Sequence, residues 1–281
     1  MKDIYIPVKI TDEEWADKLM AGDVFMRPLH EFGIWNTSKN DKLNNNYRGD
    51  NLEGATNLIK NLNEDDFLKG FSSDFKEVVK DAYYIDNGDA KYFKIFSLYC
   101  LEYDDTTNSF IKPDSKIKEF GDTAVVIRDY DTFIKRVLDK VMNQYKDFIF
   151  LIDRVTYYKN DKDASLNPLF NKNSYYGYQN ELRMAVAEST LDLNNSSAEK
   201  NMRMICDLSS VHINIGDISD IAVKVPINEF LNLDFIDKYR LIFPMNNNNR
   251  STILESIIKD TRMQMRDYLS PPDKEVVCVI Y

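Results

Sequence analysis

An aromatic turn leads into an apolar run in the segment YGYQNELRMAVA, residues 176–187. The apolar content and the alternation predict a β-strand from Tyr178 to Ala187. Successive side chains of a strand point to opposite faces, so we expect Gln179, Glu181 and Arg183 on one face. An amide, a carboxylate and a guanidinium in one row beside an aromatic turn can hold a polar ligand. The same row is also typical of a cross-strand ion pair on a solvated sheet.

Strand patterns outnumber helical patterns in the rest of the chain. Further strands are predicted at residues 4–8, 24–26, 93–101, 123–127, 148–158, 202–208, 218–225 and 275–281, and helices at residues 11–21, 64–84, 131–146 and 252–270. These elements do not alternate regularly, as they would in a parallel β-α-β fold. We therefore predict an α+β fold with a mixed, mainly antiparallel sheet and interspersed helices.

The length of the chain allows one large domain or two modest ones. It has 281 residues, and domains usually hold roughly 100–200 residues. Hydrophobic residues make up 43% of the chain, which is enough to build a core and excludes disorder throughout. No repeat and no linker divides the sequence. We predict a single domain over residues 1–281, with Asn-rich loops at about 36–54 and 244–250.

The charge balance restricts the partners of the protein. The chain carries 36 Lys and Arg residues against 46 Asp and Glu residues, a formal charge of −10. Nucleic-acid binding depends on cations that neutralise phosphates, so direct binding is not expected. A negative field instead favours a basic protein partner. No apolar run is long enough to span a membrane, so no membrane association is expected either.

Cysteine and histidine usage predicts the compartment and excludes one class of site. Cys100, Cys206 and Cys278 are odd in number, lie far apart and occur in apolar stretches, as expected for free thiols in a core. Free thiols and the lack of a signal peptide predict a cytoplasmic location. With only His30 and His212 in the chain, a histidine-rich metal site is excluded, and we predict no metal site.

The pair Gln179-x-Glu181 after the aromatic turn resembles the third motif of the bacterial ADP-ribosyltransferase toxins. Members of that family also carry an arginine on an early strand and a serine on a middle strand. Arg27 and Ser97 occupy the matching places in the correct order, and Arg48 is an equal candidate for the arginine. This chain has one counterpart to the family's Ser-Thr-Ser motif, namely Ser97.

The resemblance implies NAD as a substrate and a role for each matching residue. Glu181 would hold the ribose 2′-hydroxyl and stabilise the positive charge that develops as nicotinamide leaves. Gln179 would position the acceptor, which makes Glu181 and Gln179 the expected catalytic residues. Arg27 would contact the NAD phosphates, with Ser97 and Tyr176 as the other expected NAD-binding residues. If the protein is not an enzyme, no cofactor is expected.

A second resemblance concerns the strand itself. Its pattern Tyr-x-Asn-Glu-x-Arg, residues 178–183, is similar to a group of uncharacterised bacterial and phage proteins, which implies a setting in bacterial or phage conflict. Two hypotheses therefore remain open. The protein is an enzyme of the ADP-ribosyltransferase type, or it is a non-catalytic acidic inhibitor from a phage or mobile element. Such an inhibitor would bind a basic surface of a defence protein or a nucleic-acid-handling protein.

Overall fold

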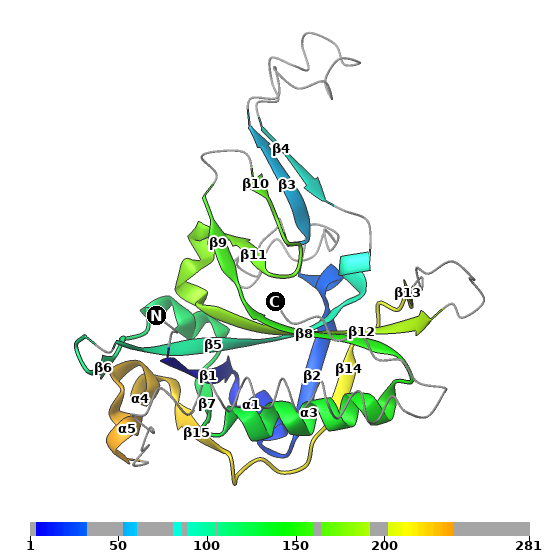
Figure 1. The fold of residues 1–281 in the computed structure, drawn as a ribbon. Coiled ribbons are helices and arrows are strands. Elements are labelled where there is room, and N and C mark those ends of the chain that lie inside the picture. Colours follow the sequence, from blue (N-terminus) through cyan, green and yellow to red (C-terminus); the bar gives the residue numbers. More distant parts are fainter. Residues whose placement is uncertain are drawn as a thin grey trace.

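A computed structural model of the protein describes residues 4–32, 53–60, 81–85, 89–104, 106–159, 164–191 and 202–238. Its main element is a sheet of ten strands whose neighbours all run antiparallel (Figure 1). These strands are β1 (Ile4–Thr11), β2 (Asp23–Pro28), β5 (Lys94–Asp104), β6 (Ser109–Phe110), β7 (Thr123–Ile127), β8 (Phe148–Arg154), β12 (Glu181–Leu191), β13 (Met202–Met204), β14 (Val211–Asn214) and β15 (Ala222–Pro226). The predicted α+β fold with a mainly antiparallel sheet is confirmed.

Smaller sheets and short helices complete the described structure. A three-stranded sheet has the order β10-β3-β4, and one parallel pair joins β9 to β11. These strands are β3 (Ala55–Lys60), β4 (Asp81–Ile85), β9 (Thr156–Tyr158), β10 (Ala164–Ser165) and β11 (Asn171–Asn173). The helices are α1 (Glu13–Met20), α3 (Tyr130–Gln144), α4 (Ile227–Asn232) and α5 (Asp234–Lys238), with 3₁₀ helices η1 (Leu29–Glu31), η6 (Asp89–Tyr92), η7 (Ser115–Phe120) and η8 (Ser174–Gln179). Within the described ranges, every helix is too short or too polar to cross a membrane.

The main sheet opens along one edge of β5. Strand β12 pairs with β5 along residues 94–99. On the other edge, β1 pairs with β5 from Tyr99 onward and β2 pairs with it at residues 94 and 95. After Val8, strand β1 continues along β7, while β2 pairs with β14. Among the described strands, none pairs with residues 96–98 on this edge, and Ser97 lies at the centre of the opening.

One face of the sheet is covered by α1 and α3, which lie beneath the strands in Figure 1. Alternate residues of β12, namely Leu182, Met184 and Val186, join the largest apolar cluster on this face. Residues of α1, α3 and β14 complete that cluster. The apolar stripe of α3 therefore has a packing role, as helical spacing predicts.

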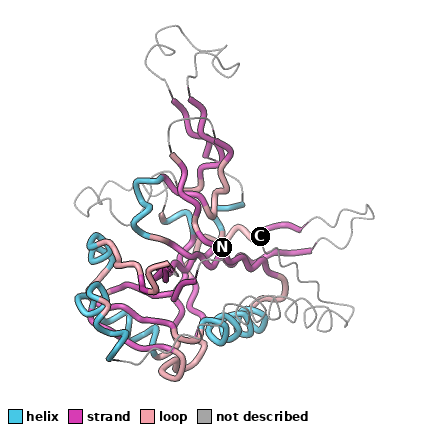
Figure 2. The backbone as a smooth tube through the Cα atoms, turned by 60° about the vertical axis from the view of Figure 1, so that its left-hand side comes forward, coloured by secondary structure: helices cyan, strands magenta, loops and turns pink. Residues whose placement is uncertain are grey.

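The opposite face carries two separate apolar clusters with polar residues between them. Ile95, Ala185 and Ala187 belong to one cluster, and Leu101 belongs to the other with α4 and α5. Glu181 and Arg183 alternate with the buried residues of the first face, so they point to this second face between the clusters. The three-stranded sheet extends away from the body, as both views of the backbone show (Figures 1 and 2).

Several predicted elements need correction. Strand β12 begins at Glu181 and not at Tyr178, because residues 174–179 form η8 and Asn180 adopts a left-handed conformation with φ of 38°. The end of the helix predicted at 64–84 is wrong, because β4 pairs there with β3. Cys206 is exposed, contrary to the expected core position, since it follows the end of β13; Cys100 is buried as expected. Residues 36–52, 244–250, 252–270 and 275–281, with Cys278, lie outside the described residues.

Candidate active site

A cavity of about 640 Å³ lies at the opening of the main sheet. Cavities that bind small molecules usually measure roughly 300–1,000 Å³. The lining comes from both sides of the opening, including Lys9 of β1, Trp15 of α1 and Phe25 of β2. The rings of Trp15 and Phe25 stack with centroids 5.6 Å apart, which gives the cavity an aromatic wall. The site is thus built where two parts of the sheet diverge.

Four of the five expected site residues line this one cavity. Arg27, Ser97, Gln179 and Glu181 are far apart in sequence and all contribute to its wall. Tyr176 is not part of the lining. Arg48, the alternative arginine, lies outside the described residues.

Strand pairing brings Ser97 next to Glu181. In the register of β5 and β12, Ser97 lies opposite Arg183 and Tyr99 lies opposite Glu181, so Ser97 and Glu181 are diagonal neighbours. The Ser97 hydroxyl donates a hydrogen bond to Oε1 of Glu181. The backbone N–H of Glu181 donates to the Tyr157 hydroxyl at 3.0 Å. Ser97 of β5 therefore orients the carboxylate, while Tyr157 of β9 holds the backbone at the start of β12.

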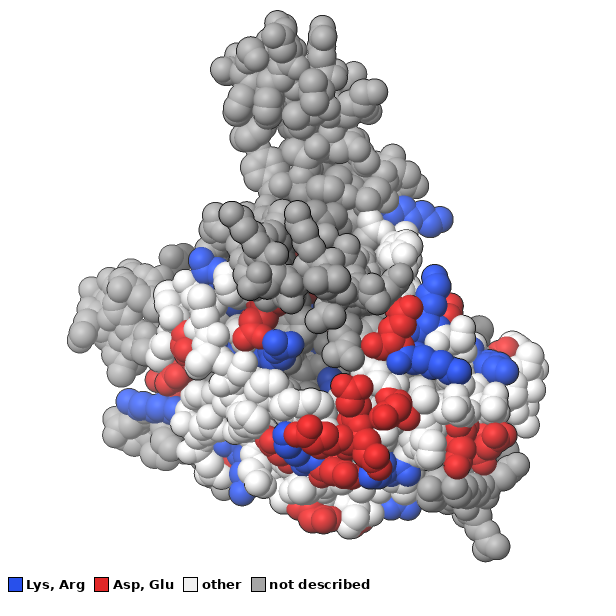
Figure 3. Space-filling model, turned by 180° about the vertical axis from the view of Figure 1, so that it is seen from behind, with Lys and Arg blue, Asp and Glu red and all other residues white. Residues whose placement is uncertain are grey.

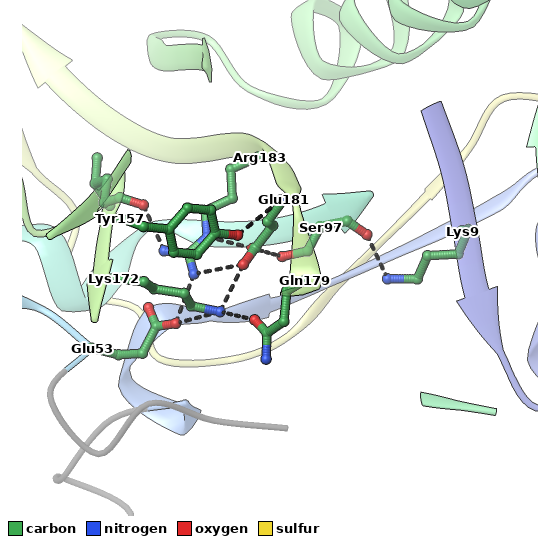
Figure 4. Close-up of polar contacts among 9 residues, drawn as sticks. Lys9, Glu53, Ser97, Tyr157, Lys172, Gln179, Glu181 and Arg183 are labelled. Atoms are coloured by element: carbon green, nitrogen blue, oxygen red, sulfur yellow. Dashed lines mark hydrogen bonds and ion pairs between the residues drawn. The ribbon is translucent and has the colours of Figure 1, made fainter. Parts of the chain in front are cut away.

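Glu181 belongs to a buried network of four charged side chains, drawn in Figure 4. Lys172 Nζ lies 2.6 Å from Glu181 Oε2 and 2.9 Å from Glu53 Oε1. Arg183 donates from Nε to Glu181 Oε1 at 2.6 Å and from Nη2 to Glu53 Oε1 at 2.7 Å. None of the four residues is more than 5% exposed. The charges of two cations and two carboxylates balance. We call these four residues the buried tetrad.

The charges of the tetrad favour the ionised forms of Glu181, Lys172 and Arg183. Burial alone would raise the pKa of Glu181, but Arg183 and Lys172 outweigh it and hold that pKa well below its ordinary value. Burial alone would lower the pKa of Lys172, but Glu181 and Glu53 outweigh it and raise that pKa. The arginine behaves like the lysine, and its pKa is raised by Glu181 and Glu53 against the effect of burial. A carboxylate that is negative at neutral pH therefore lies at the cavity wall.

Gln179 reaches the tetrad from the end of η8. Its Oε1 accepts a hydrogen bond from Lys172 Nζ at 2.9 Å. The left-handed Asn180 separates Gln179 from β12 and is held by a hydrogen bond from its Nδ2 to the carbonyl of Cys100 at 2.7 Å. Asparagine tolerates this conformation better than most residues. Gln179 thus joins Glu181 through a turn and not through the strand row that its spacing predicts.

Arg27 occupies a more open part of the cavity. Arg27 is a residue of β2 and lies opposite Ile95 of β5. About half of its side chain is exposed. Its Nε pairs with Glu31 Oε2 at 2.7 Å, and its guanidinium lies 5.8 Å from the centre of the Phe32 ring. A planar guanidinium presents several donors and remains charged, so Arg27 suits an anionic group near the mouth.

Three residues of the site were not predicted from the sequence. Lys9 donates from Nζ to the backbone carbonyl of Ser97 at 2.9 Å, across the opening. Glu53 and Lys172 complete the tetrad. None of the three belongs to a sequence motif, and isolated charged residues are usually found at the surface. The described residues contain no group of three or more His, Cys, Asp or Glu residues placed to hold a metal ion.

Comparison with known proteins finds no protein-family model, no curated protein and no solved structure that matches this chain.

Proposed function

We propose that the cavity binds NAD and that the protein transfers ADP-ribose from it, as the resemblance to the ADP-ribosyltransferases implies. One observation carries this proposal. Arg27, Ser97, Gln179 and Glu181 come from distant parts of the chain and line one cavity. The hydrogen bond from Ser97 to Glu181 adds a direct contact between two of them.

The charges of the site suit both parts of NAD. The dinucleotide carries two negative phosphates and one positive pyridinium ring. Arg27 provides a cation for a phosphate, whereas Glu181 provides a negative charge for the reacting end. Trp15 and Phe25 offer apolar surface for a planar ring. A site with cations, carboxylates and aromatic rings matches such a ligand better than it matches a purely anionic ligand.

The proposed reaction replaces the bond between ribose C1′ and the nicotinamide nitrogen. That bond breaks with its electron pair going to nitrogen, and the pyridinium becomes neutral nicotinamide. Positive charge develops on the ribose and is stabilised by the fixed carboxylate of Glu181. Ser97, Arg183 and Lys172 hold this carboxylate in place before the reaction. A nucleophile positioned by Gln179 then forms a bond to C1′, and its proton passes to solvent.

We further propose that the enzyme acts in the cytoplasm, in bacterial or phage conflict. The free thiols Cys100 and Cys206 support a reducing compartment. The acceptor is a nucleophilic group of a macromolecule or water. The rival proposal is an acidic interaction protein without catalysis, and the formal charge of −10 is the observation that favours it.

Titration with NAD and measurement of nicotinamide release test the proposed function. Glu181→Gln keeps the shape but removes the charge, and we expect turnover to fall on the order of 100-fold or more. Arg27→Gln lies outside the tetrad and should fold normally, and we expect its KM to rise about tenfold.

The matched controls are Glu14→Gln and Arg128→Gln, two exposed positions outside the cavity lining. Both should retain the wild-type kinetics. Wild-type protein that neither binds NAD nor releases nicotinamide would refute the proposal. Turnover that survives in Glu181→Gln would refute the role of that carboxylate.

A further inference from the structure

The carboxylate of Glu181 has no acceptor position left for a ligand. An ionised carboxylate offers about four lone-pair positions. Oε1 accepts from Ser97 Oγ and Arg183 Nε, while Oε2 accepts from Lys172 Nζ at 2.6 Å and from Arg183 Nη2 at 3.3 Å. A ribose hydroxyl can therefore bond to this carboxylate only if one of the four donors leaves.

Lys172 is the donor that has another acceptor at hand. Its ammonium already lies 2.9 Å from Glu53 Oε1, and Glu53 Oε2 is buried without a hydrogen-bond partner among the described residues. A buried polar atom without a partner is unfavourable, so this oxygen attracts a donor. Arg183 is less free to move, because its Nη1 also donates to the carbonyl of Leu169 and its guanidinium is rigid.

We propose that Lys172 and Glu53 act as a positioning pair that opens Glu181 to the substrate ribose. As the 2′-hydroxyl of the nicotinamide ribose approaches, Lys172 Nζ moves from Glu181 Oε2 to Glu53 Oε2. The hydroxyl then donates to the position that Lys172 has left. This inference rests on the proposed function of the cavity, and the exchange moves no proton and breaks no covalent bond.

The exchange keeps the buried charges balanced. Two cations face two carboxylates before and after it, so no uncompensated charge is created in the interior. Lys172 exchanges one carboxylate oxygen for another, and the hydroxyl takes its place on Glu181. The one acceptor of the tetrad that lacked a donor gains one. A ligand without the 2′-hydroxyl cannot complete the exchange, so the pair selects ribose over 2′-deoxyribose.

Calorimetric binding of two ligands tests the pair. The ligands are NAD and the analogue that lacks the 2′-hydroxyl of the nicotinamide ribose. Wild-type protein should bind NAD about tenfold more tightly than the analogue. Lys172→Met frees Glu181 Oε2, so it should bind NAD several-fold more tightly than wild type does, with the affinity for the analogue unchanged. Glu53→Gln cannot receive Lys172 on both side-chain atoms, so it should weaken NAD about tenfold and leave the analogue unchanged.

The ratio of the two affinities separates a positioning role from a structural one. Both ligands are measured on the same preparation, so a smaller folded fraction lowers the stoichiometry and not this ratio. Lys140→Met and Asp139→Asn, two exposed positions of α3 outside the cavity lining, are the matched controls and should leave both affinities unchanged. Equal losses for both ligands in Lys172→Met and Glu53→Gln would overturn the proposal.

A measurement without ligand distinguishes failure of the pair from failure of the proposed function. In a crystal structure of Glu181→Gln, the partner of Lys172 on β12 has lost its negative charge, and we expect Lys172 Nζ within hydrogen-bonding distance of Glu53 Oε2. A lysine that stays away from that oxygen would refute the pair, whether or not NAD binds. Wild-type protein that binds no NAD would instead refute the proposed function. The position of Lys172 in Glu181→Gln would still test whether Lys172 can move to Glu53 Oε2.

Discussion

The Ser97 hydroxyl sets the direction of one oxygen of Glu181 from the neighbouring strand. Hydrogen bonds to charged groups contribute about 1.5–3 kcal/mol. We expect Ser97→Ala to lower kcat/KM for NAD on the order of 10- to 100-fold, because the carboxylate loses one of its fixed donors. Steady-state nicotinamide release measures this loss.

Ser189 provides the control for this substitution. It is a buried serine of β12, and its hydroxyl has no hydrogen-bond partner in the described structure. Ser189→Ala should therefore leave both turnover and stability nearly unchanged. If the two alanine variants were equally active, the Ser97 hydroxyl would have no role in orienting Glu181.

The depressed pKa of Glu181 predicts a specific loss of stability in acid. In the unfolded chain this group titrates near its ordinary value of 4.5, whereas Arg183 and Lys172 hold its pKa far lower in the folded protein. The ionised Glu181 therefore contributes its full stabilisation above pH 4.5. This stabilisation is lost as pH falls toward the pKa of Glu181 in the folded protein, because in that range only the unfolded chain binds a proton at Glu181. One such proton changes the free energy of unfolding by about 1.4 kcal/mol per pH unit.

Urea unfolding of wild type and Glu181→Gln between about pH 3 and pH 6 measures this effect. The variant has no proton to bind at position 181, so its stability should fall less steeply below pH 4.5. Parallel curves for the two proteins would contradict the charge state that we assign to Glu181. The tetrad need not make the protein more stable than an apolar core would, since desolvation opposes its attractions.

At the scale of elements, the turn between α1 and β2 fixes one wall of the cavity. Gly22 has φ of 96°, and a Cβ atom built on it would lie 2.0 Å from the carbonyl oxygen of Gly216. The loop after β14 is held there by a hydrogen bond from Ile215 N–H to the Gly22 carbonyl at 2.9 Å. A side chain at this position would push that loop away from α1, which contributes Trp15 and Leu19 to the lining.

We therefore expect Gly22→Ala to reduce the free energy of unfolding by at least about 2 kcal/mol through strain and overlap. Gly177→Ala is the control, because no atom lies within 4 Å of a Cβ built there. Thermal unfolding monitored by circular dichroism compares the two variants. Equal stabilities would mean that the approach of Gly22 to Gly216 does not constrain the fold.

Prediction from sequence succeeded for a strand that is buried on both faces and for a helix whose apolar residues recur at regular helical spacing. The strand at 123–127 has the predicted bounds, since it is fully buried and apolar after Thr123. The helix at 131–146 matches α3 to within two residues because its apolar stripe is long. The start of β12 was predicted too early, because η8 and the left-handed Asn180 depend on local hydrogen bonds that leave no periodic pattern.

The candidate site was predictable only in part. The four residues of the resemblance line one cavity. Lys172 and Glu53 could not be found from the sequence, because charged residues are rarely buried and no period marks these two. Their positions follow from β9–β11 pairing and from the segment before β3, which are long-range features of the fold.

At the scale of the whole molecule, charges of both signs lie on the described part of the face that Figure 3 shows. Figure 3 shows acidic and basic side chains side by side on one face. Exposed ion pairs such as Lys224 with Asp17 and Arg136 with Asp220 account for part of this mixture. The net charge of −10 also acts on a ligand as a long-range field.

Under the net negative field, the affinity for NAD and the affinity for a basic protein partner should change in opposite directions as salt is added. NAD is a net anion, so the negative field of the protein opposes its approach, most strongly at about 10 mM salt, where the screening length is about 30 Å. At about 150 mM the screening length is about 8 Å, and we expect the affinity for NAD to rise on the order of twofold. A basic protein partner is attracted by the same field, so its affinity must fall as salt is added. Calorimetric titrations at the two salt concentrations, with neutral nicotinamide as the control, measure these changes. If the affinity for NAD falls steeply with salt, local cations such as Arg27 govern its binding and the net charge does not.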